Sequence, residues 1–368
     1  MTRSSKIVRV SALVLVVALA CAAFALSHDS PAVQVPMLPS GTLRMQAIVI
    51  PQYGSADVLK LEDVAKPTPA HDELLIKVHA ASINPLDWHR MHGTPYVARV
   101  RIGMGRPKLP RLGVDFAGTV EAIGADVKLF KVGEEIFGTA DGALAEYVTS
   151  TEVGLATKPT NMTFQQAASV PVAGLTALQG LRDAGQMRPG WKVLINGASG
   201  GVGTFAVQIA KALGAEVTGV CSTSNVQMVR SIGADHVIDY TAQDYTKGAQ
   251  RYDLIFDTVG SHSVLDERHV LTPHGTIVIV GAPSNDPWIG PIAGFLKGYF
   301  ISPFLAQRIV GVQADANKTD DLDTLRDLMQ TGKVRPVIDR QYPLREAPTA
   351  IRYLEMGHAR GKVVISLE

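Results

Sequence analysis

Glycines at positions 197, 200 and 203 are the most specific chemical signal in this sequence. They follow a short apolar run at residues 193–195, and Ala198 and Ser199 stand between the first two glycines. Glycines in such a turn let the backbone approach a diphosphate, and the free N–H groups at the start of a following helix hold its charge. The spacing departs from a strict GxGxxG, so a plain glycine-rich turn is the alternative. The pattern predicts a dinucleotide-binding turn.

A second group of polar side chains lies at residues 83–93, directly after a predicted buried strand. It includes Asn84 and Asp87, which can donate hydrogen bonds or relay a proton. Asp87 also has a structural interpretation, as a cap of a short helix that ends near Gly93. The segment is therefore a candidate for substrate chemistry.

Metal chemistry has few candidate ligands in the sequence. Cys21 and Cys221 are the only cysteines and lie in segments of different character, which excludes a disulfide framework and a Cys-rich zinc site. His79, His89 and His92 are isolated, and isolated histidines are more often surface or hydrogen-bonded groups. The sequence predicts no metal site.

The elements around the glycine turn alternate between strand and helix. Apolar residues at helical spacing predict helices over residues 202–213 and 226–232. Strands are predicted at residues 193–195, 216–220, 236–240, 252–257 and 276–281. This order predicts an α/β fold with a doubly wound parallel sheet, whose ligand lies at the carboxyl ends of the strands.

Short strands dominate the region from Met45 to about Thr160. They are predicted at residues 47–50, 58–64, 73–80, 115–123, 135–138 and 143–149, and together indicate a compact, mostly β, barrel-like domain. A capping box from Thr163 to Gln166 begins a helical link that continues over residues 171–185. After residue 308 we expect a strand, helices at 320–329 and 347–356, and a final strand at 362–367.

Length and composition indicate a globular protein of two domains. The chain has 368 residues, of which 46% are hydrophobic and 19% are charged, which is enough for two full cores. The net charge of +1 and the lack of a basic cluster argue against nucleic acid as a partner.

Residues 1–44 differ from the rest of the chain. Arg3, Lys6 and Arg9 precede an uncharged stretch at residues 10–27, the form of a membrane anchor or a secretory signal. We expect association with a membrane through this leader. Two alternatives remain: cleavage near Cys21 would export the protein, and a true start at Met45 would leave it cytoplasmic.

Six motifs in order carry a family resemblance: Asn84-Pro85-x-Asp87, Gly113 to Gly118, Gly174 to Ala177, Ala198 to Gly203, Gly233 to Tyr240, and Gly361 to Val364. From Met45 to Glu368 the chain resembles the medium-chain dehydrogenase/reductase superfamily, and within it the zinc-free quinone oxidoreductase branch that includes zeta-crystallin. The resemblance implies a GroES-like catalytic domain of residues 45–165, completed by 308–368, and a Rossmann NADPH-binding domain of residues 166–307.

The resemblance also bears on the metal and on catalysis. Asn84 and Val114 stand where the zinc alcohol dehydrogenases have a cysteine and a histidine, and neither side chain replaces those ligands. A quinone or α,β-unsaturated carbonyl needs no metal, because the charge that hydride addition creates delocalises onto oxygen. The candidate catalytic residues are Asn84, Asp87, Tyr96 and Thr176.

The cofactor is expected to be NADPH. The second strand of the nucleotide domain ends in Cys221, Ser222, Thr223, Ser224 and Asn225, with no carboxylate to bind the ribose 2′-hydroxyl of NAD or to repel a 2′-phosphate. Relatives often carry Arg or Lys near Ser224, which this chain lacks. The candidate cofactor-binding residues are Ser199, Gly200, Gly201, Val202, Gly203, Ser222, Tyr240, Val259, Gly260, Gly281, Ala282 and Lys362. For Tyr240 the alternative is packing at the end of a strand.

Residues 283–304 form an unusually apolar segment. Aromatic and aliphatic residues such as Trp288 and Phe295 occur there with only Asp286 and Lys297 charged, which predicts a flap over the cleft or a subunit contact. Either role suits a small hydrophobic carbonyl or quinone substrate and a homodimer. The alternatives are an alcohol or carbonyl oxidoreductase of the same fold, and a nucleotide-binding sensor or structural protein with little activity.

Overall fold

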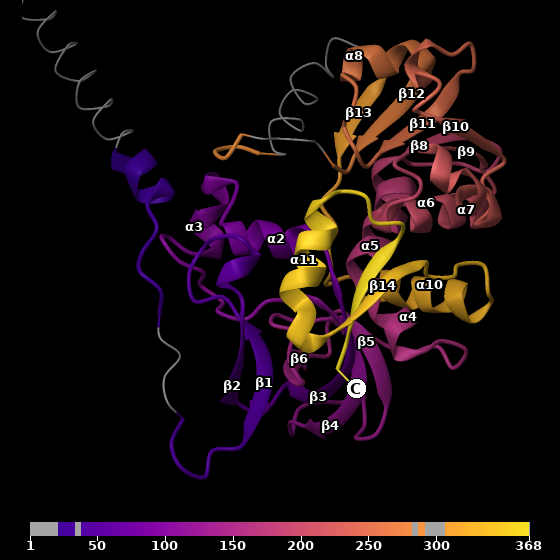
Figure 1. Ribbon diagram of the computed structural model, residues 1–368. Helices are drawn as coiled ribbons and strands as arrows, with labels where there is room; N and C mark the ends of the chain where they lie inside the picture. Colours follow the sequence, from indigo (N-terminus) through magenta and orange to yellow (C-terminus); the bar gives the residue numbers. More distant parts are fainter. Residues whose placement is uncertain (1–20, 34–37, 282–285, 291–305, 368) are drawn as a thin grey trace, which may run out of the picture.

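Two sheets organise the computed structural model, which describes residues 21–33, 38–281, 286–290 and 306–367. One sheet has six strands and the other has seven. Figure 1 shows the six-stranded sheet at the top of the molecule and the seven-stranded sheet at the bottom, with α5 (Pro171–Gln179) between them. Helix α11 (Ala347–Glu355) packs on the seven-stranded sheet. The fold is α/β, as predicted.

The six-stranded sheet is parallel throughout, in the order β10-β9-β8-β11-β12-β13. Its strands are β8 (Lys192–Asn196), β9 (Glu216–Cys221), β10 (His236–Asp239), β11 (Tyr252–Asp257), β12 (Leu271–Ile279) and β13 (Arg308–Gly311). Apolar runs form such strands because helices cover both faces of the sheet. The strand order reverses beside β8, so the predicted doubly wound sheet is confirmed.

The edge strand β13 corrects the predicted start of the returning tail at residue 308. Ile309 pairs with Ile277 of β12, and its side chain is buried in the same hydrophobic cluster. That burial holds residues 308–311 in the six-stranded sheet, whereas the sequence prediction assigned them to the first domain. The tail reaches the other sheet only at β14 (Ile338–Pro343).

The seven-stranded sheet has the order β14-β15-β3-β4-β5-β7, and β6 also pairs with β3. Its remaining strands are β3 (Glu73–Ile83), β4 (Asp115–Ile123), β5 (Glu135–Thr139), β6 (Tyr147–Thr151), β7 (Leu155–Thr157) and β15 (Lys362–Ser366). A separate antiparallel pair joins β1 (Arg44–Val49) to β2 (Lys60–Ala65). Within β15, Val363 lies opposite Ile83 of β3, so the last strand runs beside the residues that precede Asn84.

Helices cover the sheets and connect them. Besides α5 and α11 they are α2 (Pro85–His92), α3 (Arg99–Ile102), α4 (Phe164–Ala168), α6 (Gly201–Ala212), α7 (Val226–Ser231), α8 (Val264–Glu267) and α10 (Thr319–Gln330). The 3-10 helices are η1 (Ala56–Val58), η2 (Tyr96–Ala98), η4 (Thr223–Asn225), η5 (Tyr245–Lys247), η6 (Arg268–Val270) and η8 (Leu344–Glu346), and η3 (Gly180–Ala184) is a π-helical turn. The capping box predicted at Thr163 begins α4, with Thr163 Oγ1 accepting from Gln166 N.

One hydrophobic cluster joins the two lobes. Ala80 and Ala117 of the seven-stranded sheet belong to the same buried cluster as Val193 and Ile195 of β8. Residues of α5 and α6 complete it, which explains why the helical link is apolar on nearly all sides. The shared core fixes one sheet relative to the other.

The leader is described only from residue 21, and residues 21–27 are helical. Within the part of the chain that the structure describes, no helix is long and apolar enough to span a membrane. Most of the predicted apolar stretch, at residues 10–20, lies outside the described residues. Residues 26–30 contact the folded body through Arg99, whose guanidinium donates to Leu26 O and pairs with Asp29.

Candidate functional site

The glycine turn joins the end of β8 to the start of α6. Gly197 has a φ of +78°, which favours glycine, and a Cβ on Gly203 would lie 2.0 Å from Gly197 O. Gly200 is the N-cap, with no side chain capping the helix. Among the described residues, a Cβ on Gly200 would meet only Gly197 O, at 3.4 Å, so the space before the helix is open. Uncapped N–H groups beside open space fit a diphosphate.

The loops that follow β11 and β12 lie beside this turn. Thr258 N and Thr258 Oγ1 both donate to Asn196 O, at 3.2 and 2.8 Å. A Cβ on Gly281 would lie 2.3 Å from Thr258 O, so this loop also packs closely. These loops contain the predicted cofactor residues Val259, Gly260 and Gly281, whereas Ala282 lies outside the described residues.

A buried carboxylate that the sequence analysis missed holds the loop after β11. Asp257 Oδ1 accepts hydrogen bonds from Val259 N, Gly260 N and Asn196 Nδ2 at 2.8–3.0 Å. Burial raises the pKa of Asp257, and these three bonds oppose the rise. The available signal was a single acidic residue that ends an apolar strand.

The end of β9 is connected to the glycine turn through Asn225. Its Nδ2 donates to Ser199 Oγ at 3.2 Å and to Ser222 Oγ at 3.1 Å. Tyr240 follows β10 and is 57% exposed. No acid directly follows β9 in the sequence, but Asp239 of the neighbouring strand accepts from Thr223 Oγ1 at 2.6 Å. Hydroxyl and amide groups therefore lie at the place predicted for the adenosine ribose, and the Asp239 carboxylate lies beside them, bonded to Thr223.

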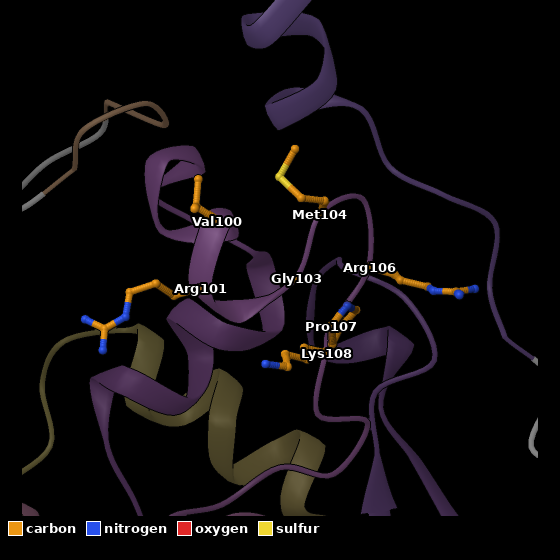
Figure 2. Close-up of a pocket in the computed structure, with 7 residues that line it drawn as sticks. All are labelled: Val100, Arg101, Gly103, Met104, Arg106, Pro107 and Lys108. Carbon is orange, nitrogen blue, oxygen red and sulfur yellow. The ribbon is translucent and has the colours of Figure 1, made fainter.

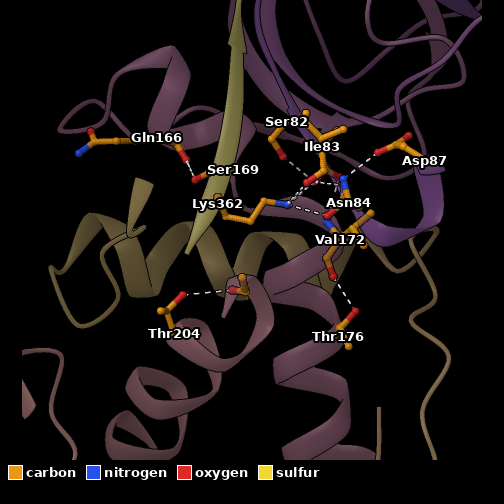
Figure 3. Close-up of polar contacts among 12 residues, drawn as sticks. Ser82, Ile83, Asn84, Asp87, Gln166, Ser169, Val172, Thr176, Thr204 and Lys362 are labelled. Atoms are coloured by element: carbon orange, nitrogen blue, oxygen red, sulfur yellow. Dashed lines mark hydrogen bonds and ion pairs between the residues drawn. The ribbon is translucent and has the colours of Figure 1, made fainter. Parts of the chain in front are cut away.

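A second polar cluster lies where β3, β4 and β15 meet α2, and Figure 3 shows its contacts. Asn84 is the N-cap of α2, and its Nδ2 donates to Asp115 Oδ2 at 2.9 Å. Lys362 Nζ donates to Asn84 Oδ1 at 2.6 Å and lies 3.4 Å from Asp115 Oδ2. Ser82 Oγ donates to the same Asp115 oxygen at 3.0 Å. All four side chains are buried.

Asp87 lies at the start of α2, beside Asn84. Its Oδ2 accepts from Asn84 N at 2.8 Å, so the carboxyl group supports the helix start from the third helical position. The predicted capping residue was wrong by three positions, because Asn84 and not Asp87 is the N-cap of α2. Its Oδ1 is buried without a hydrogen-bond partner in the described structure. Burial raises the pKa of Asp87 to about 7, because the charged form loses its solvation.

The other two predicted catalytic residues have different surroundings. Thr176 is joined to the cluster through Val172, because Thr176 Oγ1 donates to Val172 O at 2.7 Å and Val172 N donates to Asp115 Oδ1 at 3.0 Å. Tyr96 lies in η2, where its ring contacts Trp288 edge to face and the Arg99 guanidinium. The described contacts do not connect Tyr96 to Asn84.

Lys362 is placed differently from the other predicted cofactor residues. A Cβ on Gly201 would lie 3.3 Å from Lys362 Cδ, so the alkyl chain covers the first residue of α6. The ammonium group continues past the glycine turn to Asn84. One side chain therefore spans the distance between the turn and the polar cluster.

A pocket of about 460 Å³ lies away from these residues, beside α3. Arg101, Arg106 and Lys108 contribute its cationic groups, but Figure 2 shows their side chains pointing in different directions. Cationic groups that do not converge make a poor anion site. The pocket contains none of the predicted site residues.

The described part of the apolar segment, residues 286–290, contacts the first domain. Tyr96 N donates to Pro287 O at 2.7 Å, and Val97 N donates to Trp288 O at 3.2 Å. Residues 287 and 288 therefore contact η2 of the same chain. The remaining residues of the predicted flap, 283–285 and 291–304, lie outside the described residues.

The polar cluster does not fit a zinc ion. Within the described ranges, no group of three or more His, Cys, Asp or Glu side chains is placed to hold a metal. Asn84 and Val114 offer an amide and a hydrocarbon, where zinc needs thiolate, imidazole or carboxylate. The Lys362 ammonium already pairs with Asp115, and a second cation there would be repelled.

Two family models match the chain. The family described as alcohol dehydrogenase GroES-like domain matches residues 70–160. The family described as zinc-binding dehydrogenase matches residues 232–365. Their matches cover parts of both lobes.

Curated relatives match over most of their length. The mitochondrial NAD(P)H oxidoreductase RTN4IP1 of Mus musculus is 35% identical over 356 residues, covering 88% of this chain and 89% of the relative. The chloroplastic NADPH-dependent alkenal/one oxidoreductase of Arabidopsis thaliana is 34% identical, covering 91% of this chain and 83% of the relative.

A solved structure shows the same architecture. The quinone oxidoreductase from Coxiella burnetii superposes with a TM-score of 0.76 at 33% identity, covering 89% of this chain and all of that one. The six motifs lie in the same two lobes as the matches. The chain therefore belongs to the medium-chain dehydrogenase/reductase superfamily, in which its relatives and structural neighbours include quinone oxidoreductases.

Proposed function

We propose that this protein is an NADPH-dependent reductase of quinones or α,β-unsaturated carbonyls that works without zinc. The names of the relatives support this activity, since they describe an NAD(P)H oxidoreductase, an NADPH-dependent alkenal/one oxidoreductase and a quinone oxidoreductase. One observation carries the proposal: the alkyl chain of Lys362 covers Gly201 of the glycine turn, and its ammonium donates to Asn84. The proposed cofactor site and the proposed substrate site are therefore adjacent, because the same side chain contacts both.

The glycine turn fits the cofactor. The uncapped start of α6 would hold the diphosphate, and the loops after β11 and β12 would line the cofactor site. The hydroxyls of Ser222 and Ser224 lie 3.3 Å apart at the end of β9, where they could donate to a ribose 2′-phosphate. When bound, NADPH supplies a hydride to the substrate.

Asn84 assists the reaction by donating a hydrogen bond from Nδ2 to the substrate oxygen. As the hydride forms a C–H bond at an electron-poor carbon, the conjugated π bond breaks and its electrons move to that oxygen. A donor fixed in a buried site stabilises this charge more than water does, because it need not reorganise. Solvent supplies the proton that completes the reduction.

The test is a panel of acceptors with purified full-length protein. We expect NADPH oxidation with 1,4-benzoquinone and with short enones, and turnover with NADH at least tenfold slower, since a 2′-phosphate site without its phosphate loses charge-assisted bonds. Equal turnover with both nucleotides would refute the NADPH preference. Turnover only with simple alcohols or aldehydes would favour the alcohol oxidoreductase alternative, and saturable binding without turnover would favour the sensor.

We also propose the domain division that the family resemblance implied, with the boundary moved. The GroES-like domain comprises residues 45–165 and the tail from β14 onward, and β13 stays with the Rossmann domain. Limited proteolysis tests this division, because cuts are expected in the connections between the two domains. The homodimer remains a prediction, which sedimentation at several protein concentrations would decide.

We propose that residues 1–44 direct the protein to its compartment. The compared relatives are named as mitochondrial and chloroplastic proteins, so targeting to an organelle joins the membrane anchor and the export signal as outcomes. Cell fractionation with an antibody against the folded body distinguishes them. A wholly soluble cytosolic pool would exclude the anchor.

A further inference from the structure

The ammonium of Lys362 is surrounded by oxygen acceptors. Asn84 Oδ1 lies 2.6 Å from Nζ, and Asp115 Oδ2 and Ile83 O each lie 3.4 Å from it. A neutral amine has only two N–H donors, and its lone pair would face one of these oxygens, so three acceptors favour the charged form. Burial lowers the pKa of Lys362, while the charges of Asp115 and Asp87 raise it. The side chain is 3% exposed, so this cation is shielded from water.

Asp115 is fully engaged in holding the cluster. Its Oδ2 accepts from Ser82 Oγ and Asn84 Nδ2 and pairs with Lys362, and its Oδ1 accepts from Val172 N. These donors come from β3, α2, β15 and α5, which belong to both lobes. The carboxylate is therefore a fixed anion that anchors the groups around it.

These neighbours determine the orientation of the Asn84 amide. Its oxygen faces an ammonium and its nitrogen faces a carboxylate, and a flipped amide would place like partners together. An amide nitrogen carries two hydrogens, and Asp115 takes one. Among the described residues no second acceptor bonds to Nδ2, so one donor remains available.

A cation against the amide oxygen makes the amide N–H a stronger donor. Hydrogen bonds in a chain polarise one another, and the effect grows in a buried site of low dielectric constant. In the Lys362–Asn84 pair the charge-assisted bond is short, at 2.6 Å, and both residues are buried. The second N–H of Asn84 is thus the last donor of a polarised hydrogen-bond chain that begins at the Lys362 ammonium.

We propose that Lys362 is a positioning residue that orients and polarises the Asn84 amide toward the carbonyl oxygen of a quinone or enone substrate. This inference rests on the proposed function. It differs from the sequence expectation that Lys362 binds the cofactor, because the ammonium faces Asn84 and only the alkyl chain lies over Gly201. A buried lysine then assists hydride addition without touching the substrate.

The experiment compares full-length variants with wild-type protein. Lys362→Met removes the charge and keeps most of the volume, and Lys362→Gln keeps a neutral donor toward Asn84 Oδ1. For each variant we would measure kcat and KM with 3-penten-2-one and with 1,4-benzoquinone, and the Kd of NADPH by fluorescence titration. Lys158→Met is the matched control, since Lys158 Nζ is also buried and bonds Met162 O at 2.7 Å.

We expect both Lys362 variants to lower kcat with the enone by about 10- to 100-fold, the loss typical of a weakened donor to a developing oxyanion. The loss with benzoquinone should be smaller, because a quinone delocalises the charge better. The Kd of NADPH should stay within about twofold, since the diphosphate site is built from backbone groups. Lys158→Met should lower thermal stability and leave kcat unchanged.

A double variant shows whether Lys362 acts through Asn84. In an Asn84→Ala background, Lys362→Met should cost less than about threefold in kcat, because the two residues act as one unit. Independent, multiplying losses would overturn the inference, as would a tenfold weaker Kd of NADPH with unchanged kcat. If Lys362→Met does not fold, Lys362→Gln decides: a kcat equal to that of the wild-type protein would overturn the inference.

Failure of the inference is distinguishable from failure of the proposed function. If wild-type protein reduces the acceptors and both Lys362 variants match it, only the role of Lys362 is refuted. If wild-type protein binds NADPH and reduces no acceptor, the proposed function is refuted and this inference with it.

Discussion

The two polar side chains at the start of α2, Asn84 and Asp87, differ in charge and in hydrogen bonding. Asn84 is neutral and is bonded on both sides, to Lys362 and to Asp115. Asp87 is fully buried with one oxygen unpartnered, and burial raises its pKa to about 7. Substitutions at the two positions should therefore affect different quantities, turnover for Asn84 and pH-dependent stability for Asp87.

Asn84→Ala should lower kcat by about 100-fold, because one donor to the substrate oxygen is lost from a buried site. The Kd of NADPH should not change, since Asn84 lies in the other domain from the diphosphate turn. Stopped-flow measurement of NADPH oxidation with an enone checks the first expectation, and fluorescence titration checks the second. Unchanged kcat would remove Asn84 from the mechanism.

Asp87→Asn should stabilise the protein most at alkaline pH, less at pH 5, and have little effect below about pH 4. Between the unfolded pKa of about 4 and the folded pKa of about 7, the native state binds more protons than the unfolded state, so stability falls as pH rises. Above pH 7 the full cost of the buried charge is present. The amide keeps an acceptor for Asn84 N and removes that charge.

Thermal unfolding of wild type and Asp87→Asn at pH 5 and pH 8.5 tests this sign. The difference in Tm between variant and wild type should increase with pH. A difference that is constant or decreases with pH would show that Asp87 is not buried as a carboxylic acid.

At the scale of elements, the turn between β8 and α6 contains one glycine that the fold needs and one that the proposed ligand site needs. Gly203 packs against Gly197 O, and a Cβ there would come within 2.0 Å. Gly200 faces open space, where its Cβ would meet only Gly197 O at 3.4 Å among the described atoms. The two glycines are therefore needed for different reasons.

Gly203→Ala should destabilise the protein by at least about 2 kcal/mol, because the helix must move away from the turn. Gly200→Ala is the matched variant: it should leave stability within about 0.5 kcal/mol and weaken NADPH binding at least tenfold, since its Cβ enters the space predicted for the diphosphate. Urea unfolding and NADPH titration measure the two effects. Equal behaviour of the variants would contradict this division.

At the scale of the whole molecule, Arg99 fastens the leader to the body. Its side chain is 2% exposed, donates to Gly93 O at 2.8 Å, and lies over the rings of Tyr53 and Tyr96. On the other side it bonds Leu26 O at 3.0 Å and pairs with Asp29 at 2.8 Å. Residues 26–30 thus form part of the folded structure.

Deletion of residues 1–31 should lower the free energy of unfolding by about 1–3 kcal/mol, because Arg99 loses partners around a buried charge. Deletion of residues 1–20 is the control and should have no such effect, since every described contact remains. Arg99→Met should cost less in the chain lacking residues 1–31 than in the full chain. Additive losses, measured by urea unfolding in one buffer, would show that Arg99 does not hold the leader.

The sequence alone determined the local elements and the kind of cofactor site. The glycine turn, the alternation of strands and helices after residue 192, and the Thr163 capping box are encoded within a few neighbouring residues. Periodicity and capping act over one or two helical turns, so they can be recognised without knowing the fold. The family motifs extended this local reading to the whole chain.

Tertiary structure alone decided which side chains meet. Lys362 and Asn84 are 278 residues apart in the sequence, and Asp115 joins them only because β15 pairs with β3 and β3 with β4. Likewise β13 belongs to the six-stranded sheet because Ile309 fills its core, and Arg99 meets residues more than 70 positions earlier in the chain. Such contacts follow from strand pairing and core packing, which no local pattern encodes, because their free energy arises only when distant segments are buried together.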